Sequence, residues 1–251
     1  MSFMIVGVDP SSKWSAVCRN GQVKPVASRS LKEDLVASGE TAQGRDEGLV
    51  VLWDSPLSFA RARGYSNRPI DMATSRVIKA EPQIESGAAN ALHFTGVTHW
   101  ALTLDVLGLW LDGGRQGPPW SDTELRIVDR PEHLSTTSVN VVEVHPTVAL
   151  CAWWMEKSND TFRRYKRGQD VGTATRLKRC RRLWDVVGEG TPPTLETRYL
   201  APDDVLDAWA AWKLGCDWLD GKAELVGSVT EGGYLLPQGR LAEAVKAQLA
   251  E

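Results

Sequence analysis

The stretch Phe3-Met4-Ile5-Val6-Gly7-Val8-Asp9-Pro10 decides how the chain begins to fold. A short apolar run that ends in Asp-Pro is typical of a buried central strand, here with Asp9 at its carboxyl end. Two more extended runs follow at 14–18 and 23–26, with Asn20-Gly21 between them. Because Asn-Gly is the strongest short signal for a tight hairpin turn, the sequence predicts an antiparallel meander of three strands.

A second apolar run, at 48–53, predicts a fourth strand that ends on Asp54. An amphipathic helix is predicted before it, at 31–44, and strand, helix, strand is the pattern of a parallel crossover. Asp9 and Asp54 are therefore expected at the carboxyl ends of neighbouring strands, where such sheets bind ligands. The alternative for each aspartate is a turn residue that ends its strand.

Later segments continue the alternation of strands and helices. A strongly apolar helix is predicted at 97–111 and a β-branched strand at 138–146, followed by a helix at 147–155. Glu143 and His145 are two residues apart on that strand and therefore point to the same face. Short closing strands at 225–229 and 233–237 and a terminal amphipathic helix at 241–249 complete the chain. The fold class predicted is mixed α/β.

The run Pro202-Asp203-Asp204-Val205-Leu206-Asp207 predicts the start of a mostly buried helix, with Gly215 near its end or interrupting it. Asp204 and Asp207 are three residues apart and project from one face. Two buried carboxylates repel each other unless a positive charge lies between them, and Mg²⁺ or Mn²⁺ suits carboxylate oxygens. The alternative is an acidic first turn that stabilises the helix dipole and faces solvent.

The charge pattern limits how the protein can meet a polyanion. The formal net charge is −3, so nucleic-acid binding must rely on a local basic patch. The densest basic region spans 163–182, and the alternative for it is a solvated helix face. The candidate substrate-binding residues are those of this region, a basic residue in an earlier loop and the hydroxyls after the first strand: Arg163, Arg164, Lys166, Arg167, Arg68, Ser11 and Ser12.

Composition indicates where the protein is located and where its tryptophans lie. The four cysteines are scattered without a C-x-x-C pair, which favours a reducing, cytoplasmic location, and no apolar run is long enough to cross a membrane. Eleven tryptophans are expected mostly in the core, with base stacking as the alternative for one or two. Oligomeric state and the choice of DNA or RNA stay open.

Four segments together resemble the domain-of-unknown-function family 429, described as predicted RNase H-like nucleases of the RNase H-like superfamily. They are Val6-Gly7-Val8-Asp9, Trp53-Asp54-Ser55-Pro56-Leu57 with 68–76, Glu143-Val144-His145-Pro146, and 203–208. The resemblance implies one RNase H-like domain over 1–251, with a mixed sheet flanked by helices and an insertion at 81–135. It implies metal ligands at Asp9, Asp54 and Asp204 or Asp207, with Glu143 and His145 at the edge of the site. Trp53 and the long insertion depart from the family pattern.

The function expected is metal-dependent hydrolysis of a phosphodiester in nucleic acid. Three or four carboxylates holding Mg²⁺ or Mn²⁺ suit a two-metal reaction, with Glu143 or His145 as proton shuttle or outer ligand. Two other readings stay open. One is a non-enzymatic binding scaffold, and the other is an ATP-dependent enzyme of the actin and sugar-kinase fold, in which Ser11 and Ser12 would contact phosphate.

Overall fold

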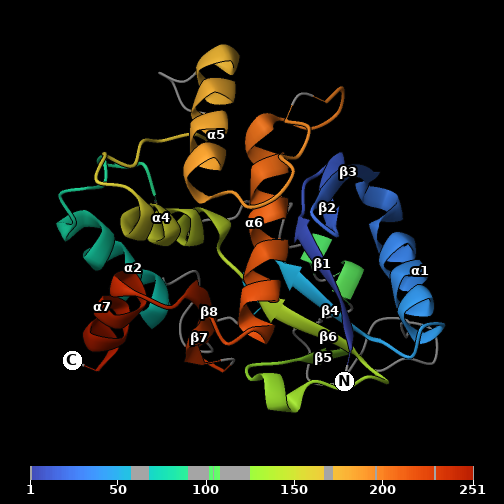
Figure 1. The fold of residues 1–251 in the computed structure, drawn as a ribbon. Coiled ribbons are helices and arrows are strands. Elements are labelled where there is room, and N and C mark those ends of the chain that lie inside the picture. Colours follow the sequence, from blue (N-terminus) through green and yellow to red (C-terminus); the bar gives the residue numbers. More distant parts are fainter. Residues whose placement is uncertain are drawn as a thin grey trace.

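The architecture was analysed in a computed structural model (Figure 1). The structure describes residues 2–57, 68–89, 102–103, 105–107, 125–166, 172–195, 197–228 and 230–250. Most of the helix predicted at 97–111 lies outside these residues, and the described positions within it are helical. The predicted insertion at 81–135 likewise falls largely outside them.

A six-stranded mixed sheet forms the centre of the fold. Its strands are β1 (Phe3–Asp9), β2 (Trp14–Arg19), β3 (Gln22–Ala27), β4 (Gly48–Trp53), β5 (Leu125–Ile127) and β6 (Val139–Glu143), arranged in the order β3-β2-β1-β4-β6-β5. The first three strands are the predicted antiparallel meander, and β1, β4, β6 and β5 run parallel. The fold is therefore mixed α/β and consistent with an RNase H-like fold. The edge strand β5 was not predicted.

Helices cover both faces of this sheet (Figure 1). Alternation along β1 sends Val6 and Val8 into a core shared with α1 (Leu31–Gln43). The opposite face packs against α6 (Pro202–Leu219), and a Cβ atom on Gly7 would lie 2.3 Å from the Ala208 carbonyl oxygen. Glycine at this position lets the helix approach the strand backbone, so α6 lies directly on β1.

Gly215 lies near the end of α6, as one of the two predicted alternatives has it, and the other alternative, that it interrupts the helix, is wrong. The helix continues to Leu219, and a Cβ atom on Gly215 would lie 2.4 Å from Leu52 Cδ2 and 2.7 Å from Ile5 Cγ2. The glycine is needed for close helix–sheet packing, which outweighs its poor helix propensity.

The remaining elements form a second layer beside the sheet. They are α2 (Pro69–Ala80), α4 (Pro146–Lys157), α5 (Thr173–Val187), α7 (Arg240–Leu249) and the antiparallel hairpin β7 (Ala223–Ser228) and β8 (Gly232–Pro237). The short 3₁₀ turns Ser28–Ser30 and Pro131–His133 complete the described elements. An isolated bridge from Val144 to Leu235 joins the hairpin to the end of β6, so this layer is anchored beside the carboxyl ends of the strands.

Candidate functional site

Asp9 and Asp54 lie side by side where β1 and β4 end. Val8 pairs with Trp53 in the parallel register, and the Asp54 N–H donates a hydrogen bond to the Val8 carbonyl oxygen at 3.0 Å. Alternation places each aspartate on the face that α6 covers, because Val8 and Trp53 before them belong to the core beneath α1. The sheet topology alone therefore brings the first two carboxylates together.

The first turns of α6 bring Asp204 and Asp207 to the same place. Pro202 begins the helix, and Asp204 Oδ2 accepts a hydrogen bond from the Ala201 N–H at 3.1 Å. Burial raises the pKa of Asp9 well above its ordinary value, and the neighbouring carboxylates Asp54, Asp207 and Asp204 raise it further. Four aspartates from two strands and one helix thus share one cluster, called here the carboxylate cluster, in which Asp207 is buried and the other three are half-buried.

Lys166 supplies a positive charge inside this cluster. Its Nζ atom lies 2.6 Å from Asp207 Oδ2, and the Tyr165 hydroxyl donates to Asp207 Oδ1 at 2.5 Å. Burial works to lower the pKa of Lys166, but Asp207, Asp54 and Asp9 outweigh it and raise the pKa above its ordinary value. The ammonium therefore stays charged and partly balances the four carboxylates.

The balance is incomplete, because one ammonium faces four acids. Burial is the main cause that raises the pKa of Asp54 to about 7. The charge of Lys166 opposes this rise, and the charge of Asp207 adds to it. Burial and the adjacent Asp203 raise the pKa of Asp204 to about 6. The Asp203 carboxylate itself pairs with Arg176 of α5, whose Nη1 atom lies 3.1 Å from Oδ1. The cluster is thus short of positive charge at neutral pH.

Glu143 and Arg68 form a separate ion cluster with Asp71. Arg68 is only 5% exposed, and its guanidinium contacts Glu143 Oε1 at 2.6 Å and Asp71 Oδ2 at 2.8 Å. The Leu57 N–H donates to Glu143 Oε2 at 2.8 Å. Glu143 points to the same face of the sheet as Val141, which packs on the α1 side. Asp9 and Asp54 lie on the opposite face. The Glu143 oxygens are held by internal partners, which favours a structural role for Glu143 and Arg68 over proton transfer or substrate contact.

His145 is also buried and lies at the start of α4. Its ring packs edge-on against Tyr234, with 5.5 Å between the centroids, and the Tyr234 hydroxyl donates to Thr74 Oγ1 at 2.7 Å. This contact joins α4 to the β7–β8 hairpin. The structure therefore places His145 on the hairpin side of the site. Glu143 lies close enough to the carboxylate cluster to raise the pKa of Asp54, but its own oxygens contact Arg68 and the Leu57 N–H.

The predicted substrate-binding residues are distributed around the cluster. Arg163 and Arg164 are exposed, and the Arg164 N–H donates to Glu85 Oε2 at 3.1 Å. Ser11 is half-buried and Ser12 exposed in the turn after β1, where the Ser11 N–H donates to Ser15 Oγ at 3.2 Å. Arg167 lies outside the described residues. Lys166, predicted to contact substrate, instead contacts Asp207.

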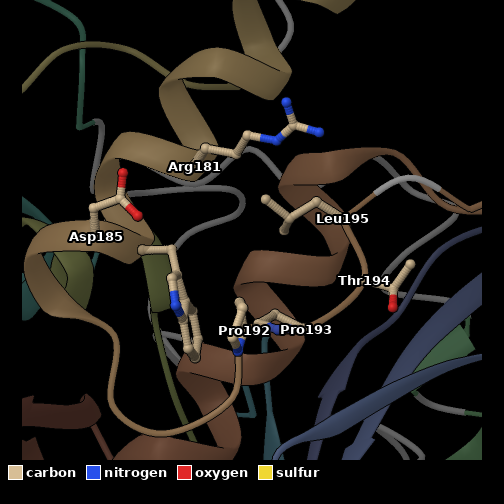
Figure 2. Close-up of a pocket in the computed structure, with 7 residues that line it drawn as sticks. Arg181, Asp185, Pro192, Pro193, Thr194 and Leu195 are labelled. Atoms are coloured by element: carbon tan, nitrogen blue, oxygen red, sulfur yellow. The ribbon is translucent and has the colours of Figure 1, made fainter.

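A groove of about 420 Å³ lies beside the C-terminal half of α5 (Figure 2). One side carries Arg181, Trp184 and Asp185, and the other carries the segment 192–195 with its two prolines. Arg181 and Asp185 lie at the helix side of the groove in Figure 2, with the apolar side chains below them. None of the four clustered aspartates lines it, so the groove is a neighbouring surface and not the acidic centre.

The donor set of the carboxylate cluster fits a hard divalent cation. Carboxylate oxygens are the ligands that Mg²⁺ and Mn²⁺ prefer. Burial, together with repulsion from neighbouring carboxylates, raises the pKa values of Asp9, Asp54, Asp204 and Asp207, and a bound cation would favour their charged forms. However, among the described residues no group of three or more acidic, histidine or cysteine side chains is already arranged to hold an ion. The Lys166 contact with Asp207 is one reason, so metal binding requires these side chains to move.

Fold and site together define a mixed α/β protein with an acidic centre at its strand ends. Residues 123–231 match the model of the family described as "Protein of unknown function (DUF429)", which confirms the resemblance over that segment. The match includes Tyr165, Lys166 and the aspartates of α6, whereas Asp9 and Asp54 precede it. No curated protein and no solved structure matches the chain. No helix in the described part of the chain has the length and apolar character to cross a bilayer.

Two features of the site escape sequence reasoning. Tyr165 donates a hydrogen bond to Asp207, whereas its place among the basic residues predicts a contact with a phosphate backbone. Asp203 is buried against Arg176, although it reads as one more acidic residue of a first helical turn. Both contacts join the region of α5 to the first turns of α6, and no local sequence pattern predicts that these segments meet.

Proposed function

We propose that this protein is a metal-dependent nuclease that hydrolyses a phosphodiester at the carboxylate cluster. The observation that carries the proposal is the convergence of Asp9, Asp54, Asp204 and Asp207 at the strand ends, where burial and neighbouring carboxylates raise their pKa values. These four residues would hold Mg²⁺ or Mn²⁺, which supplies charge stabilisation and an activated water to phosphodiester hydrolysis. The cytoplasmic location predicted from the cysteine pattern is part of this proposal.

The chain's own residues supply orientation and charge. Tyr165 fixes one oxygen of Asp207 by its hydrogen bond, and Lys166 holds the other. Exposed cations near the cluster, Arg163 and Lys178 and the Arg181 side chain at the groove, would contact the phosphate backbone. The Arg68–Glu143–Asp71 cluster keeps the end of β6 and the start of α2 in fixed positions beside the site.

Asp9→Asn tests the metal site and the activity separately. We expect millimolar Mg²⁺ or Mn²⁺ to raise the melting temperature of the wild type by binding its native state and to leave the variant unchanged. Cleavage of single-stranded and duplex DNA and RNA should require the metal and vanish in the variant, while its far-ultraviolet circular dichroism stays the same. Asp34→Asn, in α1, is the matched control and should keep both properties. Cleavage that survives Asp9→Asn contradicts the mechanism.

One observation favours a second candidate, a non-enzymatic binding scaffold. Lys166 already places a cation on Asp207, and the described side chains hold no prearranged metal site. In a scaffold the acids and Lys166 would serve only to join the strand ends to α6. This candidate predicts no metal-dependent stabilisation in the wild type, so the melting experiment above separates the two functions.

A further inference from the structure

An aromatic stack lies at the surface beside the carboxylate cluster. The rings of Trp14 and Tyr199 stack with 4.3 Å between their centroids and an interplanar angle of 29°. The Arg198 guanidinium carbon lies 5.3 Å from the centroid of the Tyr199 ring. We call these three side chains the aromatic platform.

The platform is exposed at Tyr199 and Arg198 and half-buried at Trp14, whereas most aromatic side chains in the described part of the chain are buried. Tyr199 is 45% exposed, and the other large apolar side chains exposed among the described residues are Met72 and Ile127. Arg198 is exposed as well, and so are Ser12 and Lys13 in the turn that leads into Trp14. Trp14 therefore lies against one face of the Tyr199 ring and the Arg198 guanidinium lies over the ring, while the rest of the Tyr199 side chain and two cations face solvent.

Chain geometry places the platform close to the four aspartates. Asp9 pairs with Ala16, so Trp14 lies two residues, or about 7 Å, beyond the row of Asp9 along β2. Trp14 and Ala16 are two residues apart on β2, so their side chains point to the same face of the sheet. This is the α6 side, to which Asp9 also points. Tyr199 precedes Asp204 by five residues, which span at most about 18 Å.

The segment that carries Tyr199 has a fixed conformation. The Leu200 N–H donates to Thr197 Oγ1 at 2.9 Å, and this hydroxyl donates to the Leu200 carbonyl oxygen at 3.2 Å. Ala201 in turn donates its N–H to Asp204. A short chain of hydrogen bonds therefore links the turn before the helix to the carboxylate cluster, and the platform keeps a set position relative to it.

We infer that the aromatic platform binds an unpaired nucleobase of the substrate, beside the scissile phosphate. The base would stack on Tyr199 in the place where the Arg198 guanidinium now lies over the ring, and Arg198 would move aside. A π surface combined with arginine is the usual binding site for single-stranded nucleic acid, and stacking requires a base that is out of its duplex. The inference rests on the proposed function, and it specifies the substrate class as single-stranded or locally unpaired nucleic acid. Lys13 and Arg198 would contact the phosphates that flank the stacked base.

The test uses binding without divalent metal, so that cleavage plays no part. The probe is a short DNA strand of abasic sugars that carries a single 2-aminopurine, and the reference is the same strand fully abasic. In the wild type we expect quenching of the 2-aminopurine fluorescence and tighter binding of the probe than of the reference. Tyr199→Leu should remove the quenching and weaken probe binding roughly tenfold, while binding of the reference stays unchanged.

Two variants control for folding and for exposed apolar area. Tyr199→Phe keeps the ring and should behave as the wild type, and so should Met72→Ala, which removes an exposed apolar side chain on α2. Equal binding of probe and reference by the wild type overturns the inference. So does a loss in Tyr199→Leu that is the same for both strands, or an absence of binding altogether.

These outcomes separate the platform from the proposed function. Base-dependent binding that needs Tyr199, in a protein that cleaves nothing, supports the platform and contradicts the nuclease. Metal-dependent cleavage that Asp9→Asn abolishes, together with base-independent binding, supports the nuclease and overturns the platform.

Discussion

At the scale of single residues, Lys166 decides how the carboxylate cluster behaves without metal. Its side chain is 36% exposed, yet its ammonium lies against Asp207, and both Asp54 and Asp9 raise its pKa. The same ammonium stands where a divalent cation would relieve the acids. Lys166 is therefore both a stabilising internal cation and a competitor for metal binding.

Lys166→Met should destabilise the metal-free protein by about 2 kcal/mol. Removing the cation leaves Asp207 and its neighbours buried without compensation, and partial exposure reduces the loss below that of a fully buried pair. The variant should also gain more stability from Mn²⁺ than the wild type does. Urea unfolding with and without Mn²⁺ measures both effects, and Lys24→Met, exposed on β3, is the control. Equal metal gains in Lys166→Met and the wild type would contradict the competition.

The stability of the metal-free protein should fall as pH rises from about 4 to about 7. Asp54 titrates near 7 and Asp204 near 6 in the native state, both above the ordinary aspartate pKa of 3.8. In this window the native state binds more protons than the unfolded chain, so raising the pH favours unfolding. Below the ordinary pKa the contribution is constant, and above pH 7 the penalty is complete.

Thermal unfolding in the presence of a metal chelator, measured from about pH 4 to about pH 7, checks whether stability falls as pH rises. Asp54→Asn should flatten the profile, because the amide has no proton to lose on the way to neutral pH. A wild-type profile that rises from pH 5 to pH 7 and persists in the variant would show that other groups dominate the linkage.

At the scale of elements, α6 is the part that completes both core and site. Its glycine at 215 fits against Leu52 and Ile5, and its first turns carry Asp204 and Asp207 over the strand ends. Packing of the middle of the helix thus sets the position of its acidic end. A change in the packing of Gly215 should therefore shift the whole helix and move Asp204 and Asp207 relative to Asp9 and Asp54.

Gly215→Ala should destabilise the protein by about 1–3 kcal/mol, although alanine is the better helix former. The added Cβ would approach Leu52 Cδ2 to 2.4 Å and force α6 away from the sheet. Gly39→Ala in α1 is the matched control, since its Cβ would meet nothing closer than 3.8 Å, and it should be neutral or stabilising by up to about 1 kcal/mol. Denaturant unfolding of the two variants provides the comparison.

The elements that the sequence predicted are those with strong periodicity or strong turn chemistry. The meander, the parallel crossover and the acidic start of α6 follow from apolar runs, Asn20-Gly21 and Pro202. The strand β5 was not predicted because it has only three residues, two of them exposed, and shows no hydrophobic alternation. The neighbourhood of Asp9 and Asp54 followed from topology, whereas the Lys166–Asp207 and Arg68–Glu143 contacts depend on distant segments meeting in three dimensions.

At the scale of the whole molecule, the charges are unevenly distributed. The net charge is −3, yet α5 presents the exposed cations Lys178 and Arg181 on the helix that Arg176 ties to Asp203. A polyanion should therefore approach by this helix in spite of the overall negative charge. Such an approach places its backbone next to the acidic centre.

Nucleic-acid binding should accordingly weaken with salt, and α5 should account for part of the slope. The double variant Lys178→Gln and Arg181→Gln should reduce the magnitude of the slope of log K against log salt concentration by about 1.4, as expected for two lost phosphate contacts on a single strand. The exposed pair Arg29→Gln and Arg45→Gln, on either side of α1, should leave the slope unchanged. Anisotropy titrations at several salt concentrations measure it, and an unchanged slope in the α5 variant removes this helix from the binding surface.

The two halves of the carboxylate cluster come from segments that lie far apart in the sequence. Asp9 belongs to the first strand, and Asp207 belongs to the last long helix. During synthesis on the ribosome, the sheet emerges long before the helix that covers it, so the nascent chain carries an uncovered apolar face and only half of the acidic centre. Any activity of this site therefore begins only after α6 has emerged, and a message truncated before α6 yields a product without it.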